Sequence, residues 1–222
     1  MSTMLVEQGV EISQGYLPDA IPADANAIVV GNVMKRGLDV VEHMLNHNLP
    51  YISGPQWLYE NILRDRWVLA VAGTHGKTTT SALCAHLMRE GRMRPCHYVG
   101  AEIPVLGTNA HWNEDSEYLV AEGDESDGTL VNYIPEHSIV LNIEPEHLDH
   151  YKDLDEIKAV FDQLCSQTRG MIIYCRAHAG AADVCAGYPN SVSYGWSDAD
   201  YTAADVVERR GRTLFTVFKG TE

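Results

Sequence analysis

The stretch Trp67–Thr79, WVLAVAGTHGKTT, joins an apolar run to a glycine-containing loop. The run Trp67–Ala72 predicts a buried strand, and the residues from Thr78 to Glu90 predict a helix that Gly91 closes. Small residues let a backbone approach a ligand closely, and the N-terminus of a helix attracts anions. A strand, such a loop and a helix in this order predict a phosphate-binding loop.

The predicted loop comprises Gly73, Thr74, His75, Gly76, Lys77, Thr78 and Thr79. Its glycines allow close approach, Lys77 supplies a positive charge for the outer phosphates, and Thr78 or Thr79 supplies a hydroxyl for magnesium. The loop departs from the common G-x-x-x-x-G-K-[ST] form, because Val71 occupies the position of the first glycine. A glycine-rich turn with an exposed lysine is the alternative, but the flanking strand and helix favour binding of ATP and Mg²⁺.

The rest of the chain alternates short apolar runs with helical patterns. Strands are predicted at 27–30, 50–53, 118–121, 138–143 and 171–175, and helices at 38–48, 56–64 and around 154–165. This alternation predicts an α/β fold with a mainly parallel sheet and helices on both faces. The boundary between two domains is expected near Arg66, and residues 203–222 resemble a pair of strands without a finishing helix.

The composition excludes several classes of partner. The 222 residues carry 31 acidic and 16 basic side chains, a formal net charge of -15, which argues against nucleic acid or an anionic membrane as a partner. No run is long and apolar enough to span a bilayer, and the first residues lack the layout of a signal peptide. A cytoplasmic protein with no membrane insertion is therefore expected.

Two polar segments each follow a predicted strand. The segment 121–127, AEGDESD, places Glu122 at a strand end, where a carboxylate could bind magnesium. A solvated acidic loop is the alternative. In the segment 142–151, NIEPEHLDHY, His147 could be a metal ligand, a phosphate donor or a structural group. Its position beside a phosphate loop and a carboxylate favours a functional role.

These three motifs, in this order and spacing, resemble the central ATPase domain of the Mur ligase family, the UDP-N-acetylmuramate ligases of peptidoglycan synthesis. The resemblance implies a partial Rossmann-like N-terminal domain for the UDP-sugar in residues 1–66. It implies a P-loop ATPase-type domain in 67–222 that is incomplete at its C-terminus. Because the family's third domain is missing, this polypeptide alone is expected to have little or no ligase activity.

The resemblance divides between two branches of the family. Residues from about 31 to 80 resemble the branch that re-attaches the recycled tripeptide L-Ala-γ-D-Glu-meso-diaminopimelate to UDP-N-acetylmuramate. From about Tyr98 onward, including Ser126 and the segments 107–110 and 146–151, the chain resembles the branch that adds L-alanine. L-Alanine is therefore the expected acceptor, and the tripeptide is the alternative. An ATP-binding module without ligase chemistry is an alternative of another class.

The resemblance also assigns roles to individual residues. Lys77 would bridge the β- and γ-phosphates, Thr78 and Glu122 would bind one magnesium ion, and His147 would help to bind a second ion near the acyl phosphate. Catalysis would thus depend on Lys77, Glu122 and His147. Two residues would lie near the sugar substrate, Thr108 and Asn109. We expect the lysine, threonine, glutamate and histidine to converge at one edge of the sheet.

Overall fold

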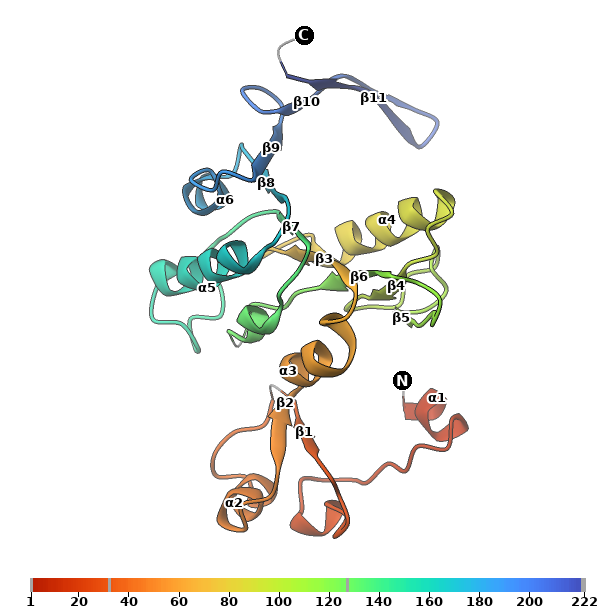
Figure 1. The fold of residues 1–222 in the computed structure, drawn as a ribbon, viewed down its shortest axis with the longest axis vertical. Coiled ribbons are helices and arrows are strands. Elements are labelled where there is room, and N and C mark those ends of the chain that lie inside the picture. Colours follow the sequence, from red (N-terminus) through yellow and green to blue (C-terminus); the bar gives the residue numbers. More distant parts are fainter. Residues whose placement is uncertain (1, 32, 127, 221–222) are drawn as a thin grey trace. The chain divides into compact units, whose positions relative to one another are not determined.

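The computed structural model describes residues 2–31, 33–126 and 128–220 (Figure 1). Asp127, the last residue of the acidic motif, lies outside them. The chain forms two compact units, Met1–Trp57 and Leu58–Glu222. The units divide upstream of the boundary predicted near Arg66, and the assignment of residues 1–66 and 67–222 to sugar and ATP binding stays a prediction.

The first unit contains a parallel strand pair joined through a helix. Its elements are α1 (Ser2–Glu7), η1 (Pro18–Ala20), β1 (Ile28–Val30), α2 (Asp39–Asn46), β2 (Tyr51–Ser53) and the start of α3 (Gly54–Leu58). Strands β1 and β2 pair in parallel, with Val29 opposite Ile52. Helix α2 buries Val41 and Met44. The predicted strands at 27–30 and 50–53 and the helix at 38–48 are confirmed.

The second unit is built around one large sheet. Its helical elements are η2 (Tyr59–Leu63), α4 (Lys77–Glu90), η3 (Thr129–Asn132), α5 (Leu154–Gln167) and α6 (Ala179–Cys185). Its strands are β3 (Trp67–Ala72), β4 (Cys96–Tyr98), β5 (Ala110–His111), β6 (Tyr118–Glu122), β7 (His137–Val140), β8 (Ile172–Cys175), β9 (Ser191–Gly195), β10 (Tyr201–Arg209) and β11 (Arg212–Lys219). Within the described residues these strands form one sheet, in the order β11-β10-β9-β8-β7-β3-β6-β4-β5.

The sheet is parallel from β4 to β10, and among the described strands only β5 and β11 pair antiparallel to their neighbours. Helices α4 and α5 lie on opposite sides of it (Figure 1). The predicted α/β class with a mainly parallel sheet is therefore confirmed. None of the helices in the described part of the chain has the length and apolar character that crossing a bilayer requires.

Strand β3 is buried on both faces, as its continuous apolar sequence predicts. Successive side chains of a strand point to opposite faces. Val68, Ala70 and Ala72 accordingly join the core beneath α5 and α6, whereas Leu69 and Val71 join the core beneath α4. This double burial fixes the end of β3, and with it the start of the loop that follows.

Gly91 is the C-cap of α4, as predicted, but the left-handed residue that follows the helix is not this glycine. Gly91 has a φ of -73°, and the left-handed residue is Arg92, with a φ of 64°. The amide of Arg92 donates to the carbonyl of Arg89, and the amide of Met93 donates to that of Met88. These two bonds form a Schellman motif in which an arginine takes the position that glycine usually occupies.

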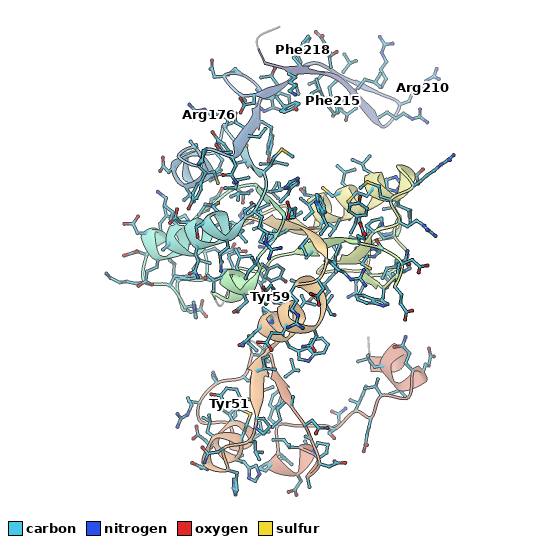
Figure 2. The ribbon with its side chains drawn as sticks, in the orientation of Figure 1. Tyr51, Tyr59, Arg176, Arg210, Phe215 and Phe218 are labelled. Atoms are coloured by element: carbon cyan, nitrogen blue, oxygen red, sulfur yellow. The ribbon has the colours of Figure 1, made fainter. Side chains whose placement is uncertain are left out.

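The last two strands form a hairpin that projects from the sheet. A register shift between Ala204 and Val207 interrupts their pairing. Phe215 and Phe218 are 57% and 40% exposed, and Figure 2 shows them on this hairpin. The predicted pair of strands near 203–222 is confirmed for the described residues up to Gly220.

Two predicted elements have other forms in the structure. Strand β7 ends at Val140 instead of at Ile143, because Asn142 leaves the sheet to bind the phosphate loop. The helix predicted at 56–64 is α3 followed by a π-helical turn, η2. The short strands β4, β5 and β9 and the helix α6 lack sequence patterns strong enough to predict them.

Candidate functional site

The predicted phosphate loop follows β3 and leads directly into α4. Gly73 has a φ of 146°, and a Cβ atom there would lie 3.0 Å from the Leu141 Cβ and 3.1 Å from the Asn142 backbone nitrogen. Gly76, at the N-cap of α4, has a φ of 84°. Both positions therefore require glycine, one mainly for space and the other for its left-handed backbone.

Asn142, after β7, braces this loop. Its backbone carbonyl accepts a hydrogen bond from the Thr74 amide at 3.1 Å. Its side-chain Oδ1 accepts one from the His75 amide at 2.7 Å, and its Nδ2 donates to the His75 carbonyl at 3.0 Å. The amide of Glu144 donates to the Thr74 hydroxyl at 2.9 Å. The sequence places Asn142 in the third motif but gives no sign of this bracing role.

Lys77 lies at the start of α4 and forms an ion pair with Glu125. The Lys77 Nζ lies 2.8 Å from the Glu125 Oε2, and it also donates to the Gly73 carbonyl at 2.7 Å. The two charged side chains are 15% and 2% exposed. Burial raises the pKa of the Glu125 carboxyl, and the hydrogen bonds and charge of Lys77 oppose that shift. The hydroxyl of Tyr151 donates to the Glu125 carbonyl, which fixes this segment.

Thr78 and Glu122 lie side by side. The Thr78 hydroxyl donates to the Glu122 Oε1 at 2.8 Å, and the Gly100 amide donates to the Glu122 Oε2 at 2.6 Å. Glu122 is the last residue of β6, which pairs with β3. A hydroxyl and a carboxylate in contact at a phosphate loop are the hard oxygen ligands that Mg²⁺ prefers, so these residues fit that ion.

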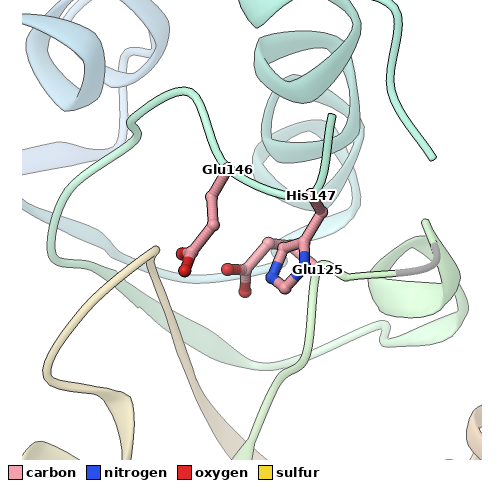
Figure 3. Close-up of side chains that lie close together, drawn as sticks. All are labelled: Glu125, Glu146 and His147. Atoms are coloured by element: carbon pink, nitrogen blue, oxygen red, sulfur yellow. The ribbon is translucent and has the colours of Figure 1, made fainter. Parts of the chain in front are cut away.

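Glu125, Glu146 and His147 form a third group, shown in Figure 3. Each offers one potential ligand atom, and these atoms all lie within 4.8 Å of one another. The backbone of His147 is left-handed, with a φ of 53°. Because Glu125 also binds Lys77, this group is continuous with the phosphate loop. A metal ion with carboxylate and imidazole ligands could be held here.

The remaining predicted site residues are less central. The side chain of His75 is 64% exposed, with its Nε2 3.8 Å from the Glu144 Oε2, and Thr79 is exposed on the first turn of α4. Thr108 and Asn109 precede β5, where the Asn109 carbonyl accepts a hydrogen bond from the Val99 amide at 2.9 Å. Their backbone therefore adjoins Val99, the residue before Gly100, whose amide binds Glu122.

One further polar residue at this edge, His178, was not among the residues predicted from the sequence. Its Nδ1 accepts a hydrogen bond from the Ile143 amide at 3.4 Å, which leaves its Nε2 to donate to the Glu144 Oε1 at 3.2 Å. His178 also caps α6 by accepting from the Ala181 amide. It thus connects α6 with the segment that braces the loop. A histidine before an alanine-rich stretch could have indicated the cap but not the contact with Glu144.

Comparison with known proteins shows that this chain is similar in sequence to a family of ligases. The family model for the Mur ligase middle domain matches residues 71–222. The UDP-N-acetylmuramate–L-alanyl-gamma-D-glutamyl-meso-2,6-diaminoheptandioate ligase of Escherichia coli (strain K12) is 40% identical over 171 residues, which cover 74% of this chain and 37% of that ligase. The UDP-N-acetylmuramate–L-alanine ligase of Geotalea uraniireducens (strain Rf4) is 33% identical over 218 residues, 96% of this chain and 47% of that ligase.

A crystal structure shows the same fold. The UDP-N-acetylmuramate:L-alanyl-gamma-D-glutamyl-meso-diaminopimelate ligase from Neisseria meningitides superimposes with a TM-score of 0.87 at 32% identity, covering 98% of this chain and 72% of that one. The chain spans less than half the length of the two curated relatives named above. With a family model matching most of its length, the chain belongs to the Mur ligase family.

Proposed function

We propose that the protein is an ATP-dependent ligase that joins the carboxylate of UDP-N-acetylmuramate to the amine of L-alanine. In this ligase, the present chain supplies the site for ATP and Mg²⁺. The observation that carries the proposal is the adjacency of two contacts, Lys77 with Glu125 and Thr78 with Glu122. It brings a cation, a hydroxyl and two carboxylates to one edge of the sheet, beside His147. That combination suits a magnesium–triphosphate complex.

The loop would bind the phosphates through backbone and side chain together. The first-turn amides of α4 at Lys77, Thr78 and Thr79 have no carbonyl partner within the helix, so they can donate to phosphate oxygens. The Lys77 ammonium would exchange its bond to the Gly73 carbonyl for one to the β- or γ-phosphate. Asn142 would keep the loop open by holding both polar backbone groups of His75.

The reaction proposed for the site is formation of an amide through an acyl phosphate. The muramate carboxylate attacks the γ-phosphorus, and ADP leaves. The amine then attacks the acyl carbon, and inorganic phosphate leaves. Thr78 and Glu122 would hold one magnesium ion and His147 a second, and these ions would neutralise charge on the transferring group. The chain's own task is to orient the phosphates and hold the reactants together.

The tripeptide L-Ala-γ-D-Glu-meso-diaminopimelate is the second candidate for the acceptor. The observation that favours it is the 40% identity to the Escherichia coli ligase, which exceeds the 33% identity to the L-alanine ligase of Geotalea uraniireducens. We further propose that Thr108 and Asn109 contact the sugar nucleotide, that the first unit helps to bind its UDP moiety, and that the protein acts in the cytoplasm.

Two measurements test the proposed function. Calorimetric titration of the 222-residue chain with ATP and Mg²⁺ should show one site that depends on the metal. A coupled phosphate-release assay on the complete product of the gene, with UDP-N-acetylmuramate and either L-alanine or the tripeptide, should show turnover with one acceptor. An absence of ATP binding would refute the nucleotide site, and ATP binding with no turnover on either acceptor would refute the ligase assignment.

A further inference from the structure

A cavity lies at the opposite end of α4 from the phosphate loop. It has a volume of about 240 Å³ and is enclosed by the end of α4, the start of β4 and the β5 region. Half of its eight lining residues are basic: Arg89, Arg94, His97 and His111. No carboxylate lines it among the described residues. In a chain with a net charge of -15, such a concentration of basic groups points to an anionic ligand.

The arginines at this cavity are available to a ligand. The Arg89 Nη2 donates to the Val105 carbonyl at 2.6 Å and lies 3.4 Å from the His86 Nδ1, which leaves Nε and Nη1 free of these bonds. Within the described part of the chain, neither Arg89 nor Arg94 has a carboxylate within ion-pair distance. A guanidinium group presents five donors in a planar arrangement that matches an oxyanion.

The histidines form a facing pair on adjacent strands. His97 and His111 are directly opposite in the pairing of β4 with β5, and their rings stack with centroids 5.8 Å apart. The His97 Nε2 donates to the Thr108 carbonyl at 3.2 Å, so its Nδ1 is the ring atom left for a ligand. Burial lowers the pKa of His97, the hydrogen bond to the Thr108 carbonyl opposes that shift, and the neighbouring His111 and Arg89 add to the lowering. A bound anion would relieve this repulsion between like charges.

The cavity is separate from the proposed nucleotide site. Arg89 lies twelve residues after Lys77 on the same helix, which corresponds to about 18 Å at a rise of 1.5 Å per residue. A nucleotide bound at the helix N-terminus would therefore not fill it. Its 240 Å³ also falls below the roughly 300–1,000 Å³ of pockets that enclose drug-sized ligands, which favours a small ion over a nucleotide.

We propose that this cavity binds a small tetrahedral oxyanion such as inorganic phosphate, with Arg89 and Arg94 as its principal partners. His97 contributes a further donor when it is protonated. Binding is therefore tighter at pH 6 than at pH 8 for an anion whose own charge is constant over that range. The groups that face His97 are the basic side chains of Arg89 on α4, His111 on β5 and Arg94 before β4, and all of them favour the anion.

The test is a calorimetric titration with inorganic phosphate and, separately, with sulfate, at constant ionic strength. It uses the full chain carrying Lys77→Ala, so that the phosphate loop contributes little. We expect one saturable site, and we expect Arg89→Gln combined with Arg94→Asn to weaken it at least tenfold. Asparagine suits position 94 because the φ there is 46°. The matched control is Arg92→Gly, which removes a nearby exposed charge that does not line the cavity.

A second experiment tests the proposal without the arginine double variant, so its result does not depend on whether that variant folds. Sulfate stays a dianion between pH 6 and 8, so its affinity for the chain carrying only Lys77→Ala should rise at least threefold from pH 8 to pH 6. His97→Gln with His111→Gln should abolish that rise. The proposal is overturned if neither anion binds saturably below about 10 mM, if the Arg92→Gly control weakens binding as much as the double variant does, or if sulfate affinity is the same at both pH values.

Discussion

Lys77 is held in place by groups of three kinds: the loop carbonyls, the Glu125 carboxylate and the helix that follows. Glu125 is nearly inaccessible to water, so its charge is compensated chiefly by this lysine. The pair keeps the ammonium next to the loop before any ligand arrives. In the proposed ATP site, a phosphate oxygen would then need to displace only a carbonyl from Lys77.

Replacing Lys77 by alanine should therefore abolish detectable ATP binding. The variant removes the charge-assisted hydrogen bonds from Lys77 to the phosphates. Two such bonds at about 1.5 kcal/mol each correspond to a loss of at least about 100-fold in ATP affinity. Calorimetric titration with ATP and Mg²⁺ measures the effect. Lys152→Ala, whose side chain is 81% exposed, is the matched control and should bind as the unchanged chain does. Near-normal affinity in the Lys77 variant would contradict the assigned role.

His97 should make the chain less stable in mild acid. Burial, then His111 and Arg89, lower its pKa below the usual 6.5, so the unfolded chain takes up the proton first as the pH falls. The stability that neutral His97 contributes is present above about pH 6.5 and is lost as the pH falls through the lowered pKa.

Urea unfolding between pH 5 and 8, in a buffer without oxyanions, checks this effect. His97→Gln should flatten the decline of the unfolding free energy toward pH 5. His86→Gln, on the neighbouring surface of α4, serves as the control and should leave the decline in place. Equal slopes for the His97 variant and the unchanged chain would refute the assignment.

At the scale of elements, the site depends on how the ends of β3, β6 and β7 are held together. Because these strands are parallel neighbours, their carboxyl ends meet at one edge, where ligands bind in open α/β sheets. Asn142 connects the end of β7 to the loop after β3. The loop shape therefore depends on a neighbouring strand as well as on its own glycines.

Asn142→Ala should weaken ATP binding while leaving the fold intact. The change removes both side-chain hydrogen bonds to His75 and leaves that residue's backbone groups to water. We expect ATP affinity to fall about tenfold, since the two bonds together contribute about 1–3 kcal/mol to loop order. Asn142→Asp keeps the acceptor for the His75 amide and should have a smaller effect. Titration of both variants with ATP measures the two affinities. Unchanged affinity in Asn142→Ala would show that Asn142 does not support the loop.

Phe161 packs α5 against the sheet and should contribute much of the stability that this packing provides. It is 0% exposed and lies in the core that also contains β3 and β6 residues. Phe161→Ala should lower the unfolding free energy by about 3–5 kcal/mol, because it creates a cavity in a packed core. Gln163→Ala, exposed on the same helix, should change it by less than about 0.5 kcal/mol. Urea unfolding of the two variants provides the comparison.

At the scale of the whole molecule, the two curated ligases from Escherichia coli and Geotalea uraniireducens are more than twice as long as the chain. Because the chain covers only 37% and 47% of these two ligases, we expect the 222-residue chain to bind ATP without catalysing ligation. A phosphate-release assay with UDP-N-acetylmuramate and either acceptor should give no turnover above the rate without enzyme. Robust turnover by the chain would show that the site is complete without further residues.

Much of this architecture followed from local sequence. The apolar run of β3 is bounded by Gly73, and amphipathic α5 repeats its core residues at helical spacing, so both were predictable from periodicity alone. Short elements such as β4 and β5 were not, because a strand of two or three residues carries too little pattern. The left-handed Arg92 escaped prediction because the adjacent glycine was the expected residue for that conformation.

The sequence by itself determined the α/β class, through the periodicity of nearby residues. It also predicted the phosphate loop and the motif residues Lys77, Thr78, Glu122 and His147, from local motifs and from the resemblance to a family. Only the tertiary structure decided that Glu125 pairs with Lys77, that Asn142 braces the loop, and that basic residues of α4, β4 and β5 enclose one cavity. Those contacts join segments far apart in the chain, and they depend on strand order and burial, which local patterns do not encode.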